Sequence, residues 1–237
     1  MPLRKLPTFD VLDWNALEGA LLSQGYGLIR QVLDHKTCHG LIALFDQGPF
    51  FRKRIVMERH NFGRGEYSYF SYPLPNIVSH LRTELFRYLV PIANRFNDIM
   101  KRQIAYPPTL ELFQKHCRAT GQTQPTPLIL RYEAGGYNCL HRDLYGVTAF
   151  PFQAMIVLNQ QGKDFEGGEF VLVENRPRQQ SRALVVNPNQ GDLLIFPVSD
   201  RPVPGKRGML RASMRHGVSP ISAGQRWVLG VIFHDAK

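Results

Sequence analysis

The sequence predicts a mainly β protein in which N-terminal helices buttress an antiparallel sandwich or barrel. Two observations lead to this fold class. From residue 126 onward, short apolar or alternating runs recur between Gly, Pro, Asn and Asp, a spacing typical of antiparallel strands. No strand–helix alternation follows, which disfavours a parallel α/β architecture. We therefore expect a single domain over 1–237, with a helix-rich support region over 1–125 and the β core over 126–237.

The helices are expected before residue 125. Asp13 and Asp34 each precede an apolar stretch and can cap a helix. Pro91 predicts a kink or a break in the longest helix, because proline cannot donate the helical hydrogen bond. The expected elements are, in order, a helix over 14–23, a short strand over 28–33, a helix over 34–45, basic and aromatic strand and loop over 52–72, and helices over 76–100 and 106–120.

The strands of the β core follow from the apolar runs between turn residues. Each run is short, and Gly, Pro, Asn or Asp separates it from the next. The expected strands cover residues 128–132, 137–143, 152–158, 169–173, 183–186, 192–196 and 226–233.

Composition and charge narrow the class of protein. Lys and Arg total 29 against 19 Asp and Glu, for a net charge of +10. This balance either maintains solubility or indicates a polyanionic partner such as nucleic acid. Three widely spaced cysteines exclude a disulfide framework and a CxxC zinc site. No apolar run can span a bilayer and residues 1–9 lack the apolar segment of a secretory signal, so we expect a soluble cytoplasmic protein without membrane contact.

A metal site is predicted from three residues. His141 and Asp143 are two apart on an expected strand, so their side chains point to the same face. With His216 they would form the two-histidine, one-carboxylate triad that holds non-haem Fe(II). Such a pair is more often solvated, and His216 alone could be an ordinary histidine at a strand end. The sequence has no GxGxxG, Walker A or HExxH motif to suggest another chemistry.

Arg226 adds a second requirement to this site. It begins the last apolar run, and a buried cation there needs an anionic partner. No acidic residue lies between Asp200 and Asp235 to supply one. A small dicarboxylate would, whereas a non-catalytic cupin-like barrel would not need this arginine.

Four motifs resemble those of the prolyl 4-hydroxylase-like Fe(II)/2-oxoglutarate-dependent dioxygenases, in the same order. They are RYEAGGYNCLHRD at 131–143, FEGGEF at 165–170, QGDLLIF at 190–196 and HGVSPISAGQR at 216–226. The resemblance covers residues 128–235. It implies a double-stranded β-helix, or jelly roll, with helices packed on it. It also implies the cofactors Fe(II) and 2-oxoglutarate, with ascorbate as a reductant.

The resemblance also implies roles for single residues. His141, Asp143 and His216 would ligate iron, and no catalytic side chain is expected beyond this metal centre. Arg226 would pair with the distal carboxylate of 2-oxoglutarate, and the Tyr132 hydroxyl would bond the cosubstrate unless it is a core tyrosine. Gln153 lies on a strand facing the site and could also touch 2-oxoglutarate. By parity Tyr137 shares the face of His141, where it would line the pocket or serve packing.

The substrate is inferred from charge and from a second resemblance. GEFVLVENRPR at 168–178 and RWVLGVIFHD at 226–235 are similar to a group of small bacterial 2-oxoglutarate oxygenases, some associated with the DNA-alkylation response. Lys206, Arg207, Arg211 and Arg215 precede His216, so we expect them to flank the iron and bind substrate phosphates. A second basic cluster at 52–64 is interleaved with aromatic residues that could stack bases.

These observations favour oxidative dealkylation of damaged bases in nucleic acid. Single-stranded DNA should be preferred, because an enzyme that attacks a base must reach it outside the stack. A protein hydroxylase, prolyl by resemblance, is the first alternative. A non-catalytic nucleic-acid binding module with a vestigial iron site is the second.

Overall fold

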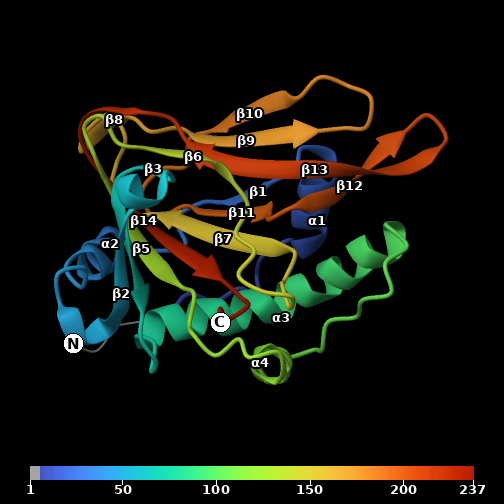
Figure 1. Ribbon diagram of the computed structural model, residues 1–237, viewed down its shortest axis with the longest axis horizontal. Helices are drawn as coiled ribbons and strands as arrows, with labels where there is room; N and C mark the ends of the chain where they lie inside the picture. Colours follow the sequence, from blue (N-terminus) through green and yellow to red (C-terminus); the bar gives the residue numbers. More distant parts are fainter. Residues whose placement is uncertain (1–5) are drawn as a thin grey trace.

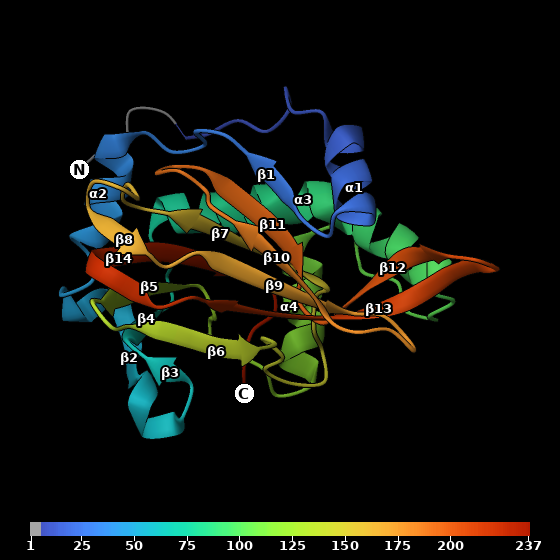
Figure 2. The same ribbon diagram turned by 90° about the horizontal axis from the view of Figure 1, so that it is seen from above.

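Two antiparallel sheets lie face to face, and helices cover the outer face of the larger one (Figures 1 and 2). The computed structural model describes residues 6–237, so the first part of the segment without a secretory signal lies outside the described residues. The helices are α1 (Trp14–Ser23), α2 (His35–Ile42), α3 (Asn76–Ile99) and α4 (Leu110–Ala119), with 3-10 turns η1 (Gly48–Phe50) and η2 (Met57–His60). None of these helices is long and apolar enough to cross a bilayer.

The larger sheet has eight strands. Its order is β1 (Gly27–Ile29), β11 (Leu193–Pro197), β7 (Phe152–Val157), β14 (Ile221–Ile232), β5 (Leu128–Glu133), β4 (Glu66–Phe70) and β2 (Phe51–Val56), with β8 (Phe165–Gly167) also pairing with β14. The smaller sheet has six strands. Its order is β10 (Arg182–Val186), β9 (Phe170–Asn175), β13 (Gly208–Val218), β6 (Tyr137–His141) and β3 (Gly63–Arg64), with β12 (Asp200–Gly205) pairing with β13.

The helices begin where their caps predict. The Asp13 carboxylate accepts a hydrogen bond from the backbone N–H of Ala16, and Asp34 accepts one from Thr37, so each satisfies an N–H that its helix leaves free. Of the two outcomes predicted at Pro91, the break is wrong, since α3 continues through this residue as one helix, and the kink stays a prediction. It runs along the outside of the larger sheet, below the strands in Figure 1.

Strand alternation divides the apolar side chains into two cores. On β7, Phe152, Ala154 and Ile156 pack toward α3, whereas Met155 and Val157 point to the space between the sheets. The same alternation on β14 sends Trp227, Leu229 and Val231 toward the helices and Val228 toward the smaller sheet. Arg226 and Gln153 share the parity of these inward residues, so both enter the space between the sheets.

Two expectations about the elements need correction. The division at residue 125 does not follow the sheets, because β1, β4 and β3 pair with β11, β5 and β6 of the expected core. The hairpin of β12 and β13 was not predicted either. Pro202 and Pro204 lack the backbone N–H of a central strand, and β12 tolerates them at the edge of the sheet. The hairpin projects to the right in Figure 1.

Candidate metal centre

Two neighbouring strands bring the three predicted metal ligands together. β6 pairs with β13 so that His141 is the register partner of His216, and their ring centroids lie 4.2 Å apart. Asp143 follows the end of β6 in a loop. One of its oxygens lies 3.5 Å from His141 Nε2 and the other lies 3.3 Å from His216 Nε2. The three groups offer ligand atoms within 4.8 Å of one another, which is close enough for one metal ion.

The surroundings of these groups suit metal binding. Burial alone would raise the pKa of Asp143, but hydrogen bonds from His141 and His216 outweigh it and hold the pKa well below its usual range. Burial lowers the pKa of His216, which favours the neutral imidazole that binds metals. The Nδ1 atom of His141 lies 2.8 Å from the carbonyl oxygen of Cys139, an acceptor, so Nδ1 carries the proton and Nε2 stays free for a metal.

The donor set fits Fe(II). Two imidazoles and one carboxylate on one side of a site leave positions open for other ligands, as in non-haem iron oxygenases. The buried Nδ1 of His216 has no hydrogen-bond partner among the described residues, so no hydrogen bond orients this ring for the metal.

A cavity of about 340 Å³ between the sheets connects the triad with Arg226, Tyr132 and Gln153. Arg226 is 2% exposed, and within residues 6–237 it forms no ion pair with a carboxylate. Burial lowers the pKa of Arg226 to about 10, which still leaves it charged at neutral pH. Such an uncompensated cation is costly unless an anion binds there. The dicarboxylate expected from the sequence fits this requirement.

Two neutral polar groups face the same cavity. The Tyr132 hydroxyl accepts a hydrogen bond from Asn138 Nδ2 at 3.3 Å. Gln153 is 7% exposed, and its Oε1 has no partner in the part of the chain that the structure describes. Gly168, with a φ of +68°, lies so close that a Cβ there would be 2.8 Å from the Cδ of Arg226. The glycine turn therefore allows the arginine side chain to pass.

A β-bulge changes the face on which Tyr137 lies. Between the pairs His216–His141 and Val218–Asn138, β6 has one more residue than β13. Asn138 consequently lines the cavity together with His141. Tyr137 is 40% exposed and is absent from the described lining, so the parity expectation for this residue is wrong.

The basic residues before His216 lie away from the cavity. Lys206 and Arg207 connect β12 to β13 at the tip of the projecting hairpin (Figure 1). Arg211 and Arg215 are exposed and alternate with the buried Ala212, Met214 and His216, so they occupy the opposite face of β13. None of the four is among the described residues that line the cavity. The expected place beside the iron is therefore corrected, whereas contact with a long substrate stays a prediction.

Other basic residues form ion pairs within the protein. Arg201 is fully buried and binds Glu174, which also contacts Arg176 and Arg182. In the cluster at 52–64, Arg54 pairs with Glu66. Only part of the net positive charge is thus available to a partner.

Sequence reasoning missed several residues of the site. The Tyr145 hydroxyl donates to Asp143 Oδ1 at 2.7 Å, and burial raises the pKa of Tyr145 well above its usual value, so the phenol keeps its proton. Phe62 and Arg142 line the cavity near its opening. The Asp143–x–Tyr145 spacing was a usable signal for the tyrosine. Phe62 belongs to the aromatic residues of the basic cluster at 52–64 that the sequence offered for base stacking, and the β3–β6 pairing brings it to the cavity.

Comparison with known proteins agrees with this geometry. Two solved structures resemble the chain in fold. A prolyl-4-hydroxylase from Pseudomonas putida is 14% identical with a TM-score of 0.53, covering 95% of this chain and 100% of that one. An oxidoreductase of the 2OG-Fe(II) oxygenase family from Burkholderia pseudomallei is 15% identical with a TM-score of 0.54, covering 99% and 98%. The predicted double-stranded β-helix is confirmed, and the protein is an Fe(II)/2-oxoglutarate-dependent dioxygenase.

A match to a protein-family model shows the family to which this chain belongs. Residues 65–236, well over half of the chain, match a family described as an oxygenase catalysing oxidative methylation of damaged DNA, and the chain belongs to this family. An uncharacterized protein of Mycobacterium tuberculosis is 41% identical over 169 residues, which is 71% of this chain and 72% of that protein.

Proposed function

We propose that this dioxygenase acts on nucleic acid and removes alkyl groups from damaged bases by oxidation. The observation that carries the proposal is the single cavity that joins the His-Asp-His triad, an unpaired buried Arg226 and an opening with aromatic and cationic side chains. The family description, which names damaged DNA, supports it. With dioxygen as the oxidant and the keto acid decarboxylated to succinate and CO2, the iron would support hydroxylation of the alkyl carbon on nitrogen, which would then leave as an aldehyde.

The side chains of the cavity divide this work among them. His141, Asp143 and His216 would hold the iron, and Arg226 would bind the distal carboxylate of 2-oxoglutarate. Tyr132 and Gln153 would orient the cosubstrate by hydrogen bonds, since both lie in the same cavity as Arg226. The two sheets would shield the reacting groups from water, because the triad residues His216 and Asp143 are 5% and 8% exposed.

The opening of the cavity offers a surface for a base. Phe62 is 47% exposed, and its ring stacks on His60 with the centroids 5.3 Å apart. The turn that carries it is fixed, because Phe62 N–H donates to Met57 O and Phe62 O accepts from Cys139 N–H. An exposed aromatic ring on a rigid turn can stack with an unpaired base. We therefore assign Phe62 to base binding.

Arg142 would hold a phosphate beside that base. Its guanidinium is oriented by two hydrogen bonds, a 3.0 Å bond to Met214 O and a 2.6 Å bond to Ser213 Oγ. Within the described chain it forms no ion pair with a carboxylate, so its charge is available to a ligand. An arginine fixed in this way suits a phosphate contact that positions the strand. Lys206, Arg207, Arg211 and Arg215 would contact the strand farther from the iron.

Salt dependence of DNA binding tests the proposal. Three to five phosphate contacts predict a slope of log K against log salt of about −2 to −4.5, and single strands should bind better than duplex. Replacing Lys206, Arg207 and Arg211 with Gln should flatten the slope. The matched control replaces Lys36, Lys115 and Arg118, which removes the same charge elsewhere. A flat response in the parent, or equal slopes in both triple variants, would contradict the nucleic-acid assignment.

A protein (prolyl-type) hydroxylase is the second candidate. The observation in its favour is Leu140, which lines the cavity and is 41% exposed, so the opening could also receive an apolar peptide. Succinate release from alkylated single- and double-stranded DNA, RNA and Pro-containing peptides under one condition would separate the two. The vestigial binding module has lost its support, since the donor set is complete. The cytoplasmic location and a role for ascorbate stay predictions.

A further inference from the structure

The carboxylate ligand of the triad lies on a loop. Asp143 comes after β6 ends at His141, in the connection that leads to β7. No strand pairing fixes this residue, unlike the two histidines. A tyrosine hydroxyl does contact it: the half-buried Tyr145 donates to Oδ1 of Asp143 at 2.7 Å. Oδ1 is thereby engaged by the phenol and also lies 3.5 Å from Nε2 of His141, whereas Oδ2 lies 3.3 Å from Nε2 of His216.

The ring of Tyr145 is fixed by aromatic side chains from two distant segments. It meets Tyr69 of β4 edge-on, with the centroids 6.2 Å apart and the planes at 89°. On another side it packs against His234, which follows β14, with the centroids 5.8 Å apart. Its place between these residues means that the hydroxyl has one defined position relative to Asp143.

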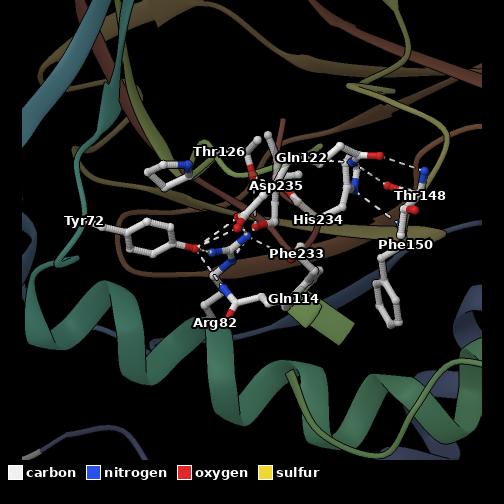
Figure 3. A network of polar contacts seen from close by, with 12 residues as sticks. Tyr72, Arg82, Gln114, Gln122, Thr126, Thr148, Phe150, Phe233, His234 and Asp235 are labelled. Carbon is white, nitrogen blue, oxygen red and sulfur yellow. Dashed lines mark hydrogen bonds and ion pairs between the residues drawn. The ribbon is translucent and has the colours of Figure 1, made fainter. Parts of the chain in front are cut away.

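The far part of the same loop is held by the amide of Gln122 (Figure 3). Gln122 Oε1 accepts from the Thr148 N–H at 2.9 Å, and Nε2 donates to the Thr148 carbonyl oxygen at 2.8 Å. The same Nε2 donates to the carbonyl oxygen of Asp235, whose carboxylate binds Arg82 at 2.7 Å. Gln122 is fully buried, so these bonds replace water completely.

Gly146 permits this close contact. A Cβ at Gly146 would lie 2.4 Å from Cδ and Oε1 of Gln122, a distance that real Cβ atoms do not reach. The loop therefore has a small residue at the point where the amide approaches it. Gln122, Thr148 and Gly146 together form what we call the amide clamp.

We propose that Tyr145 is a positioning residue that orients Asp143 for the metal, and that the amide clamp holds the loop that carries Tyr145. With Oδ1 engaged by the phenol, Oδ2 is the oxygen available to the metal, and Asp143 takes one coordination position instead of two. The positions left open then serve the cosubstrate and oxygen. This inference rests on the iron site of the proposed function but not on its substrate.

Metal affinity of Tyr145→Phe tests the role of the hydroxyl. The phenyl ring keeps the packing against Tyr69 and His234 while the hydrogen bond to Asp143 is lost. We expect Co(II) to bind about 10- to 100-fold more weakly, as for other residues that orient metal ligands, and its visible ligand-field spectrum to change. Both are measured by titration without substrate, so a failure of the nucleic-acid assignment would leave this test unaffected.

Tyr106→Phe is the matched control. The Tyr106 hydroxyl also bonds the same loop, donating to the Ala149 carbonyl oxygen at 3.0 Å, but it does not touch a metal ligand. This variant should keep the Co(II) affinity and spectrum of the parent. If Tyr145→Phe binds Co(II) as the parent does, or if both variants lose affinity equally, the positioning role of Tyr145 is overturned.

The amide clamp is tested by Gly146→Ala, which forces the loop away from Gln122 without removing a hydrogen-bonding group. We expect faster amide hydrogen exchange over residues 144–149 and weaker Co(II) binding than in the parent. Gly40→Ala is the control, because a Cβ there has no neighbour within 4 Å. Unchanged exchange and affinity in Gly146→Ala would refute the clamp.

Discussion

Two arginines of this protein are both buried but differ in whether other residues of the chain bind the guanidinium. Arg82 on α3 is fully buried and bonded on all sides: it donates to the carbonyl oxygens of Ile232 and Phe233, to the Tyr72 hydroxyl and to Asp235 (Figure 3). Arg226 on β14 is as deeply buried, but within the described residues it has aromatic neighbours in place of acceptors, with the Tyr132 ring 5.9 Å away.

Whether a buried arginine has an acidic partner in the chain distinguishes a structural role from a proposed ligand-binding role. A buried guanidinium must be compensated, because its removal from water is unfavourable. Where the chain supplies the partner, as Asp235 does for Arg82 and Glu174 does for Arg201, the ion pair joins elements of the fold. Arg226 forms no ion pair within the described residues and lines a cavity, so we propose that a ligand supplies its compensation.

The largest expected effect concerns the triad beside Arg226. His141→Ala, Asp143→Ala or His216→Ala should each abolish Fe(II) binding and 2-oxoglutarate turnover, because each removes one of the three donors. Metal titration and succinate release measure this loss, and circular dichroism checks that the chain stays folded. Full turnover in any one variant would remove that residue from the set of ligands.

Arg82→Met comes next, and it should act on stability alone. The substitution leaves the Asp235 carboxylate buried without its cation, so we expect a loss of about 3–5 kcal/mol in the free energy of unfolding. Urea denaturation measures it. The KM for 2-oxoglutarate should remain that of the parent where the variant is folded. A stable Arg82→Met protein would mean that the network is not needed for the fold.

Arg226→Met makes the same chemical change at the other arginine and should give the opposite pattern. We expect the KM for 2-oxoglutarate to rise about 100-fold, since hydrogen bonds to charged groups contribute about 1.5–3 kcal/mol. The free energy of unfolding should fall far less than in Arg82→Met, because Arg226 forms no ion pair within the described residues and interacts with the Glu169 carboxylate only at longer range. Steady-state kinetics and urea denaturation together decide the point: an unchanged KM would make Arg226 structural.

The smallest expected effect is a pH dependence from His234, beside the Arg82 network. Burial lowers the pKa of His234 to about 4, so the folded chain binds fewer protons there than the unfolded chain. Stability from this group is complete above about pH 6.5 and falls as the pH drops toward 4, by about 2 kcal/mol between pH 7.5 and 5. His216, also lowered by burial, adds to the same window.

Urea denaturation across this pH range measures the effect. His234→Asn should make the dependence less steep, and the exposed His39→Asn should leave it as in the parent. Equal pH dependence in parent and His234→Asn would show that the burial of this ring has no consequence for stability.

Features that depend on neighbouring residues in the sequence could be predicted, whereas features that depend on distant segments could not. Most core strands and the helix caps depend on local patterns, and the patterns located them. The triad and Arg226 come from motifs that are in the family's order along the chain; the fold brings all four residues to one cavity, and their roles stay predictions. β13 was missed although it carries His216, since Pro, Arg and Gly around residues 202–208 hide the alternation of the hairpin.

The rest depended on contacts between distant segments. Neither strand of the bulged pair β6 and β13 shows in its own sequence that Asn138, and not Tyr137, enters the cavity. The ion pair of Arg201 is also a tertiary feature, because only the fold brings Glu174 to it. The distance of Lys206 and Arg207 from the cavity depends on the direction in which the β12–β13 hairpin projects. These features are tertiary, and one sequence alone does not contain them.

The network around Arg82 has a consequence for biosynthesis. Its partners are far apart in the chain: Asp235 comes 153 residues after Arg82 and 113 residues after Gln122. A ribosome delivers Arg82 and the loop after β6 long before it delivers Asp235. The loop that presents Asp143 therefore cannot reach its final arrangement while translation of this segment continues. If the amide clamp orders this loop as proposed, we expect iron to bind only after β14 has been made.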